Sequence, residues 1–89
     1  MSHLYEDRAA TLGRIGGTLE SLIETLNTIR MQLPAMPAAE RPAALARYAS
    51  LLERARTWRW YLEVQREAVG LTRHELIDEV YPLPPAEPV

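Results

Sequence analysis

The sequence predicts an all-α protein built on two long helices that fold back on each other as an antiparallel hairpin. First, apolar residues recur in a three-four alternation across residues 12–33, which is the signature of a helix seam. Second, prolines at positions 34 and 37 separate this stretch from a second one of similar length, over residues 39–69, and equal arms suit a hairpin. The chain has 89 residues and no cysteine, so we expect a single domain over residues 1–81 without disulfide bonds.

The first helix is predicted over about residues 4–33. Ile23 widens its apolar stripe, as expected of a helix that packs against more than one neighbour, and Tyr5 continues the stripe one heptad earlier. The helix ends at Leu33-Pro34, because proline disfavours helical geometry in the residue before it. The stripe itself consists of Leu12, Ile15, Leu19, Leu22, Leu26, Ile29 and Leu33.

Three glycines interrupt this helix, and each costs about 1 kcal/mol relative to alanine in a helix interior. One interpretation is a break, with Thr18 capping a new helix. The other is a continuous helix in which Ala9, Gly13 and Gly17, spaced by four residues, form a small-residue face that admits a close neighbour. The heptad phase runs through Gly13, Gly16 and Gly17 without interruption, so the sequence favours the continuous helix.

The second helix is predicted over about residues 39–69. Pro42 must lie in its first turn, where the missing N–H is tolerated, and Gly70 suits a left-handed C-terminal cap. Leu45, Leu52 and Tyr61 flank its predicted seam. That seam reads Ala44, Tyr48, Leu51, Ala55, Trp58, Leu62, Gln65 and Val69.

A short third helix is predicted over about residues 73–81, because Thr72 and Glu75 have the spacing of a capping box. Pro82 stops this helix, and residues 82–89 form an extended proline-rich tail. Residues 71–89 carry four acids and one arginine, whereas residues 39–70 carry four acids and six arginines. One explanation is that the acidic tail lies against the basic second helix.

The predicted helices carry more apolar surface than one hairpin can cover. We therefore expect a homo-oligomer, in the simplest case a dimer that completes a four-helix bundle. Its candidate seam consists of Leu19, Leu22, Ile23, Leu26 and Ile29.

An arginine-aromatic cluster on the second helix is the candidate site for a protein partner, because these residue types are enriched at interface centres. The candidate residues are Arg56, Arg59, Trp60 and Tyr61. The alternative is single-stranded nucleic acid, which stacks on aromatic rings and pairs with guanidinium groups. Trp58 and Trp60 point about 200° apart on a helix, and the net charge is −2, so the protein partner is favoured.

The sequence offers little for catalysis or cofactors. It contains no lysine, which excludes a Walker-type phosphate loop and Schiff-base chemistry. Neither histidine has a glutamate three residues earlier, as a di-iron bundle needs. Residues 66–76 resemble the opening of a Cro/C1-type helix-turn-helix, but the prolines from Pro82 onward leave no recognition helix. We expect a non-enzymatic, cofactor-free, cytoplasmic bacterial protein with no membrane span.

Overall fold

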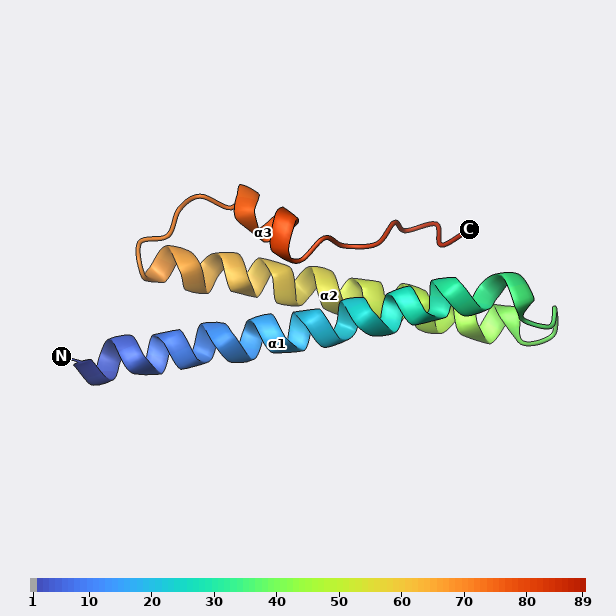
Figure 1. The fold of residues 1–89 in the computed structure, drawn as a ribbon, viewed down its shortest axis with the longest axis horizontal. Coiled ribbons are helices and arrows are strands. Elements are labelled where there is room, and N and C mark those ends of the chain that lie inside the picture. Colours follow the sequence, from blue (N-terminus) through green and yellow to red (C-terminus); the bar gives the residue numbers. More distant parts are fainter. Residues whose placement is uncertain (1) are drawn as a thin grey trace.

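A computed structural model describes the backbone of residues 2–89 and the side chains of residues 7–89. It contains the helices α1 (Ser2–Gln32), α2 (Arg41–Ala68) and α3 (Glu75–Val80), with a 3-10 turn, η1 (Leu33–Ala35), after α1. The two long helices run antiparallel along a molecule of 56 × 22 × 15 Å (Figure 1). The predicted all-α hairpin with a short third helix is therefore confirmed. The predicted seam position of Tyr5 lies outside the described side chains.

Helix α1 continues through its glycines from Ser2 to Gln32, as the uninterrupted heptad phase predicts. Its apolar stripe forms the core, with Leu12 packed at the edge of that core. The buried stripe residues are Ile15, Leu19, Leu22, Leu26, Ile29 and Leu33. A strict heptad stripe thus identifies the buried side of α1.

The connection between the long helices is short and held by the backbone. The N–H of Met36 donates to the carbonyl of Leu33 at 3.1 Å, and Pro34 lies within η1. Pro42 lies in the first turn of α2, where a missing N–H leaves no helical hydrogen bond unmade. Both proline positions follow the prediction.

The buried side of helix α2 is rotated about the helix axis from the side that the predicted seam defines. Tyr48, Ala55 and Leu62 are buried as expected, but Leu51 and Trp58 are only half-buried, and Leu52 is fully buried in their place. The C-terminal segment bonds to this side of α2, where Tyr48 donates to Pro85 and Arg59 to Asp78, and Leu52 lies in the same helical register as Tyr48 and Arg59.

Gly70 ends α2 in the left-handed conformation, with φ of +87°. The Gly70 N–H donates to the carbonyl of Glu67 and the Leu71 N–H to that of Arg66, both at 2.9 Å. This pair of bonds is the Schellman motif, in which glycine is favoured because it has no side chain to strain. The predicted cap is confirmed.

The start of α3 corrects the capping-box prediction. The helix begins at Glu75 rather than residue 73, its N-cap residue is His74, and no side chain caps it. The Arg66 guanidinium donates to the carbonyl of Arg73 at 3.0 Å, which ties residues 71–74 to α2 in a non-helical path. Thr72 is therefore not the cap, and α3 ends at Val80.

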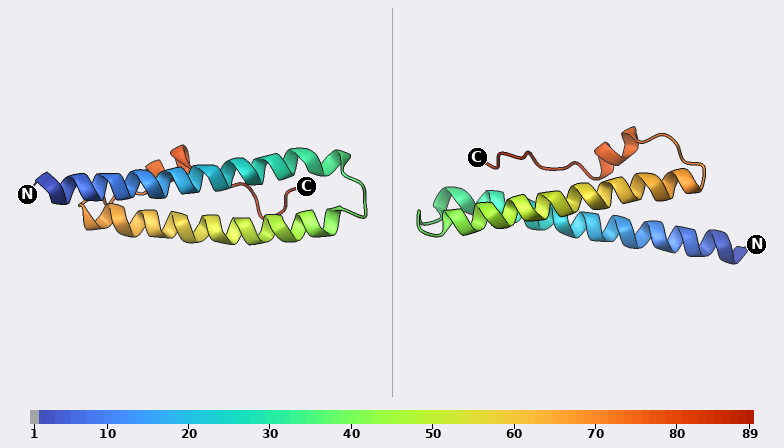
Figure 2. Two further views of the ribbon diagram at one scale, coloured as in Figure 1. Left: turned by 90° about the horizontal axis from the view of Figure 1, so that it is seen from below. Right: turned by 180° about the vertical axis from the view of Figure 1, so that it is seen from behind.

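The C-terminal segment, residues 71–89, lies lengthwise on the hairpin as a third layer (Figures 1 and 2). Ile77 and Pro84 are buried, and Leu83 packs against the core. The Tyr48 hydroxyl donates to the carbonyl of Pro85 at 2.5 Å. The tail is extended, as predicted from its prolines, and is bound to the hairpin along its length.

Candidate interaction surfaces

The five residues predicted to form an oligomer seam lie inside the single chain. Leu19, Leu22, Ile23, Leu26 and Ile29 are each at most 9% exposed. Helix α2 packs along this stripe, and Tyr81 of the C-terminal segment approaches α1 at Gly16. These side chains are therefore core residues of the single chain, and an oligomer seam formed by them stays a prediction.

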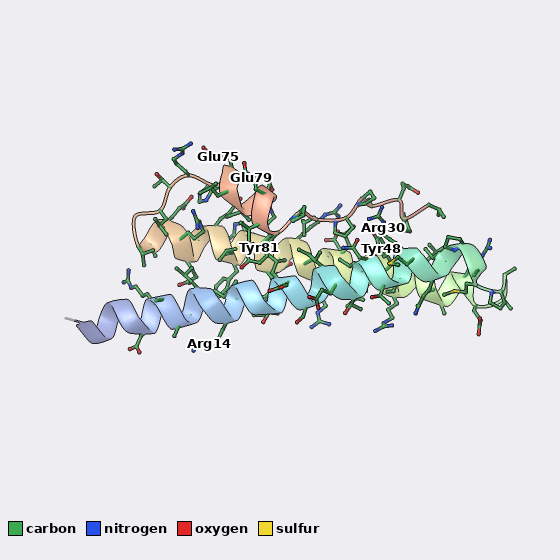
Figure 3. The ribbon with its side chains drawn as sticks, viewed as in Figure 1. Arg14, Arg30, Tyr48, Glu75, Glu79 and Tyr81 are labelled. Atoms are coloured by element: carbon green, nitrogen blue, oxygen red, sulfur yellow. The ribbon has the colours of Figure 1, made fainter. Side chains whose placement is uncertain are left out.

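Tyr81 shows how closely the third layer approaches α1. Gly16 is buried, and a methyl group at that position would collide with the Tyr81 hydroxyl and ring. By contrast, Gly13 and Gly17 have no such neighbour. Figure 3 shows Tyr81 and Tyr48 on the side of the hairpin that faces the C-terminal segment. The close neighbour that a glycine of α1 accommodates is thus Tyr81 of the same chain, and the glycine is Gly16.

The four candidate partner-binding residues do not form one surface. Arg59 pairs with Glu63 at 2.7 Å and with Asp78 of α3 at 2.6 Å, and the hydrogen bond to Asp78 raises the pKa of the Arg59 guanidinium. Arg59 therefore ties α3 to α2 within the molecule. Its charge is already compensated, unlike that of an arginine available to a partner.

Arg56 and Trp60 lie one turn apart on the outward side of α2. Arg56 pairs with Glu53 at 2.6 Å, and the Trp60 side chain is 60% exposed. Val64, one turn further along, is also exposed. These residues form an outer ridge, which we define as Arg56, Trp60 and Val64.

Tyr61 lies on a different side of α2, together with Trp58. Their rings meet edge to face, with centroids 6.0 Å apart and planes at 83°. Both rings line a shallow groove of about 320 Å³ with Thr11, Arg14 and Thr18 of α1. No residue of the C-terminal segment lines this groove.

This groove belongs to an uncovered side of the hairpin, which we call the open face. On α2 it follows a heptad register made up of Arg47, Leu51, Arg54, Trp58 and Tyr61. On α1 it follows Thr11, Arg14, Thr18 and Thr25. Figure 2, left, looks onto α1 and α2 side by side with the C-terminal segment behind them.

The threonines of the open face are satisfied by their own helix. The hydroxyls of Thr11, Thr18 and Thr25 each donate to the carbonyl four residues earlier, at 2.9–3.0 Å. Such bonding leaves no free hydroxyl proton and turns a methyl group toward the surface. The α1 side of the open face is therefore more apolar than its sequence suggests.

The open face is basic. Among the described side chains, Arg47 and Arg54 make no ion pair, and Arg14 donates only to the Thr11 hydroxyl, at 3.1 Å. Asp7 is the acidic residue in the same register of α1. Arg14 lies on the opposite side of the molecule from Glu75 and Glu79 (Figure 3).

The arginines of the open face are functional candidates that the sequence prediction missed. The signal was present, since Arg47 and Arg54 are seven residues apart and precede Trp58 and Tyr61 in one heptad register. This spacing alone does not say which side of α2 is uncovered; the position of the C-terminal segment does. The outer ridge and the open face are therefore two separate candidate interaction surfaces.

Among the residues that the structure describes, no three histidine or acidic side chains gather in a way that could hold a metal ion. None of the described helices is long and apolar enough to cross a membrane. Models of known protein families, curated protein sequences and solved structures were compared with this chain, and none of them matches it.

Proposed function

We propose that this protein is a non-enzymatic helical module that binds other proteins through the uncovered sides of α2. The observation that carries the proposal is the exposure of Trp60, 60% of whose side chain faces solvent on a rigid helix. Indole burial supplies a large share of the binding energy at protein interfaces. A tryptophan left outside a core in this way is suited to dock into a partner's pocket.

The neighbours of Trp60 fit the same role. Val64 extends the apolar surface by one helical turn, and Arg56 supplies a charged rim whose guanidinium is already oriented by Glu53. An apolar centre with a polar rim is the usual anatomy of an interface. Because α2 is braced by α1 and α3, the ridge needs little ordering on binding.

The expectation of a homo-oligomer stands as part of this proposal, on a different basis from the sequence prediction. The surplus apolar residues Ile23 and Leu52 are buried within the single chain, so they give no reason to dimerise. Exposed apolar and aromatic residues instead remain on the outer ridge and the open face.

Nucleic-acid binding is the second candidate function, favoured by the three arginines of the open face. Their guanidinium groups are available for phosphates, and Tyr61 offers an exposed ring for stacking. The net charge of −2 argues against long-range attraction to a polyanion. The protein-binding proposal is therefore preferred.

Affinity capture with matched variants tests the proposal. Immobilised wild-type protein, Trp60→Ala and Met31→Ala are exposed to host lysate with and without nuclease; Met31 is 82% exposed but lies elsewhere, near the end of α1. We expect a protein retained by wild type and Met31→Ala, lost with Trp60→Ala, and indifferent to nuclease. Identical captured sets for all three forms would contradict the proposal, and a nuclease-sensitive set would support the nucleic-acid alternative.

A further inference from the structure

The molecule separates its charges onto opposite faces. The C-terminal segment carries four acids and one arginine; Asp78 pairs with Arg59 and Glu75 with Arg73, so Glu79 and Glu87 are its acids without an ion pair among the described side chains. Glu75 and Glu79 lie on the side of α3 that faces away from the hairpin (Figure 3). The open face on the other side carries Arg14, Arg47 and Arg54 without an acidic partner among the described side chains. The two faces are therefore complementary in charge to each other.

The open face also exposes apolar groups. On α3, Leu76 and Val80 are exposed beside the acidic side and line a pocket with Leu12, Gly13 and Leu62 of the hairpin. On the open face, Tyr61 is exposed, Leu51 and Trp58 are half-buried, and the threonine methyl groups extend the same surface. The open face thus combines apolar contact area with positive charge, and the outer side of α3 carries negative charge bordered by Leu76 and Val80.

We propose that the occupant of the open face is a second copy of this chain, which docks the acidic outer side of its C-terminal segment there. The inference rests on the proposed function as an interaction module and names one of its partners. Charge selects this arrangement over a two-fold symmetric one. Open face against open face would oppose Arg47 and Arg54 to their own copies, and α3 against α3 would oppose glutamates.

The contact is heterologous, because it joins two different surfaces of the same chain. Those surfaces lie on opposite sides of the molecule, so one contact leaves a free surface at each end of the pair. Such contacts build rings or open chains rather than closed dimers. Self-association should consequently continue beyond the dimer as concentration rises, and it should weaken with salt.

Charge reversal tests the contact. Variant A is Arg47→Glu/Arg54→Glu, and variant B is Glu79→Arg/Glu87→Arg; none of these four residues forms an ion pair within the described chain. The control, Arg8→Glu/Arg41→Glu, changes the net charge as variant A does but leaves the open face and the outer ridge intact. Sedimentation analysis of each protein is carried out from micromolar to millimolar concentration, at about 20 mM and about 500 mM salt.

We expect the wild type and the control to associate at low salt, and each reversal variant to associate at least about tenfold more weakly. Mixing variants A and B restores association, because each supplies a complementary face to the other. A wild type that stays monomeric, a plateau at the dimer, or an equal mass for variant A and wild type would overturn the inference.

Two further measurements distinguish self-association from the Trp60-dependent partner and from nucleic-acid binding. Trp60→Ala should associate like wild type, so a Trp60-dependent partner can exist whether or not the copies associate. Fluorescence titration with a single-stranded oligonucleotide completes the set. Binding that variant A abolishes, in a wild type that does not self-associate, would assign the open face to nucleic acid instead.

Discussion

The two flanks of the hairpin carry similar types of residue but differ in how deeply those residues are buried. On one flank, Leu52 and Ile23 are buried, and Gly16 lies against Tyr81 of the chain's own C-terminal segment. On the other, Leu51, Trp58 and a line of threonines and arginines stay uncovered. Leu51 and Leu52 are adjacent in sequence and point about 100° apart on α2, so residue type alone does not decide burial. The side of α2 that each residue faces also matters.

The largest expected effect comes from this leucine pair. Leu52→Ala should lower the free energy of unfolding by about 3 kcal/mol, because it leaves a cavity under the third layer. Leu51→Ala should cost about 1 kcal/mol, because that side chain is only half-buried. Urea unfolding followed by circular dichroism measures both. Equal losses would mean that the C-terminal segment does not cover the Leu52 side.

Alanine substitutions at Gly16 and Gly17 should change the stability of the protein in opposite directions. Gly17→Ala should stabilise the protein by about 0.5–1 kcal/mol through helix propensity, since nothing lies within 4 Å of the new methyl group. Gly16→Ala should destabilise it by about 1 kcal/mol, because the Tyr81 ring must move. Thermal unfolding measures both variants. Tyr81→Phe in the Gly16→Ala background should recover part of the loss, and equal stabilisation by both alanines would contradict the close approach.

The Tyr48 hydroxyl makes the stability of the protein depend on pH. Burial raises the pKa of Tyr48 above its ordinary value of 10.0, although Arg30 opposes the shift. The folded state therefore holds the phenolic proton more tightly than the unfolded state does. The resulting stabilisation is present below pH 10 and is lost as pH rises from about 10 through the raised pKa.

Tyr48→Phe should flatten this alkaline loss and cost about 1 kcal/mol at neutral pH, through the missing hydrogen bond to Pro85. Tyr61→Phe, which removes an exposed hydroxyl from the open face, is the control and should cost little at neutral pH. Urea midpoints at pH 7 and above pH 10 test this pair. A wild-type stability that rises above pH 10 would contradict the sign of the shift.

The smallest effect is expected from the ion pairs. Asp78→Asn removes the link between α2 and α3, yet the Asp78 side chain is 68% exposed, so the loss should stay below about 1 kcal/mol. Glu53→Gln, which breaks a pair within α2, should cost still less. Unfolding at low and high salt distinguishes them, since a charge contribution should shrink on screening.

The long helices could be predicted from sequence because their signals are local and repeated. The stripe from Leu12 to Leu33 repeats its spacing for three heptads, and Gly70 marks a cap by a property that no other residue shares. The same reasoning failed at Thr72. A capping-box spacing competes there with tethers from Arg66 to the Arg73 backbone and from Glu67 to His74, which no local pattern contains.

The candidate site was harder to predict because it depends on contacts between distant residues. Tyr48 meets Pro85 across 37 positions, and Arg59 meets Asp78 across 19. Those contacts decide that Ile23 is interior and that Arg59 is already paired. Sequence patterns identified aromatic and basic residues on α2, but only the third layer divides them between the outer ridge, the open face and the interior.

The C-terminal segment forms a fixed third layer on the hairpin, and the approach of Tyr81 to Gly16 is the contact that reports on this layer. Nuclear magnetic resonance of the full chain should show nuclear Overhauser contacts between the Gly16 α-protons and the Tyr81 ring, with the α-protons shifted by the ring. If those contacts are absent and residues 82–89 show random-coil chemical shifts, the hairpin has no covered face and the account is wrong.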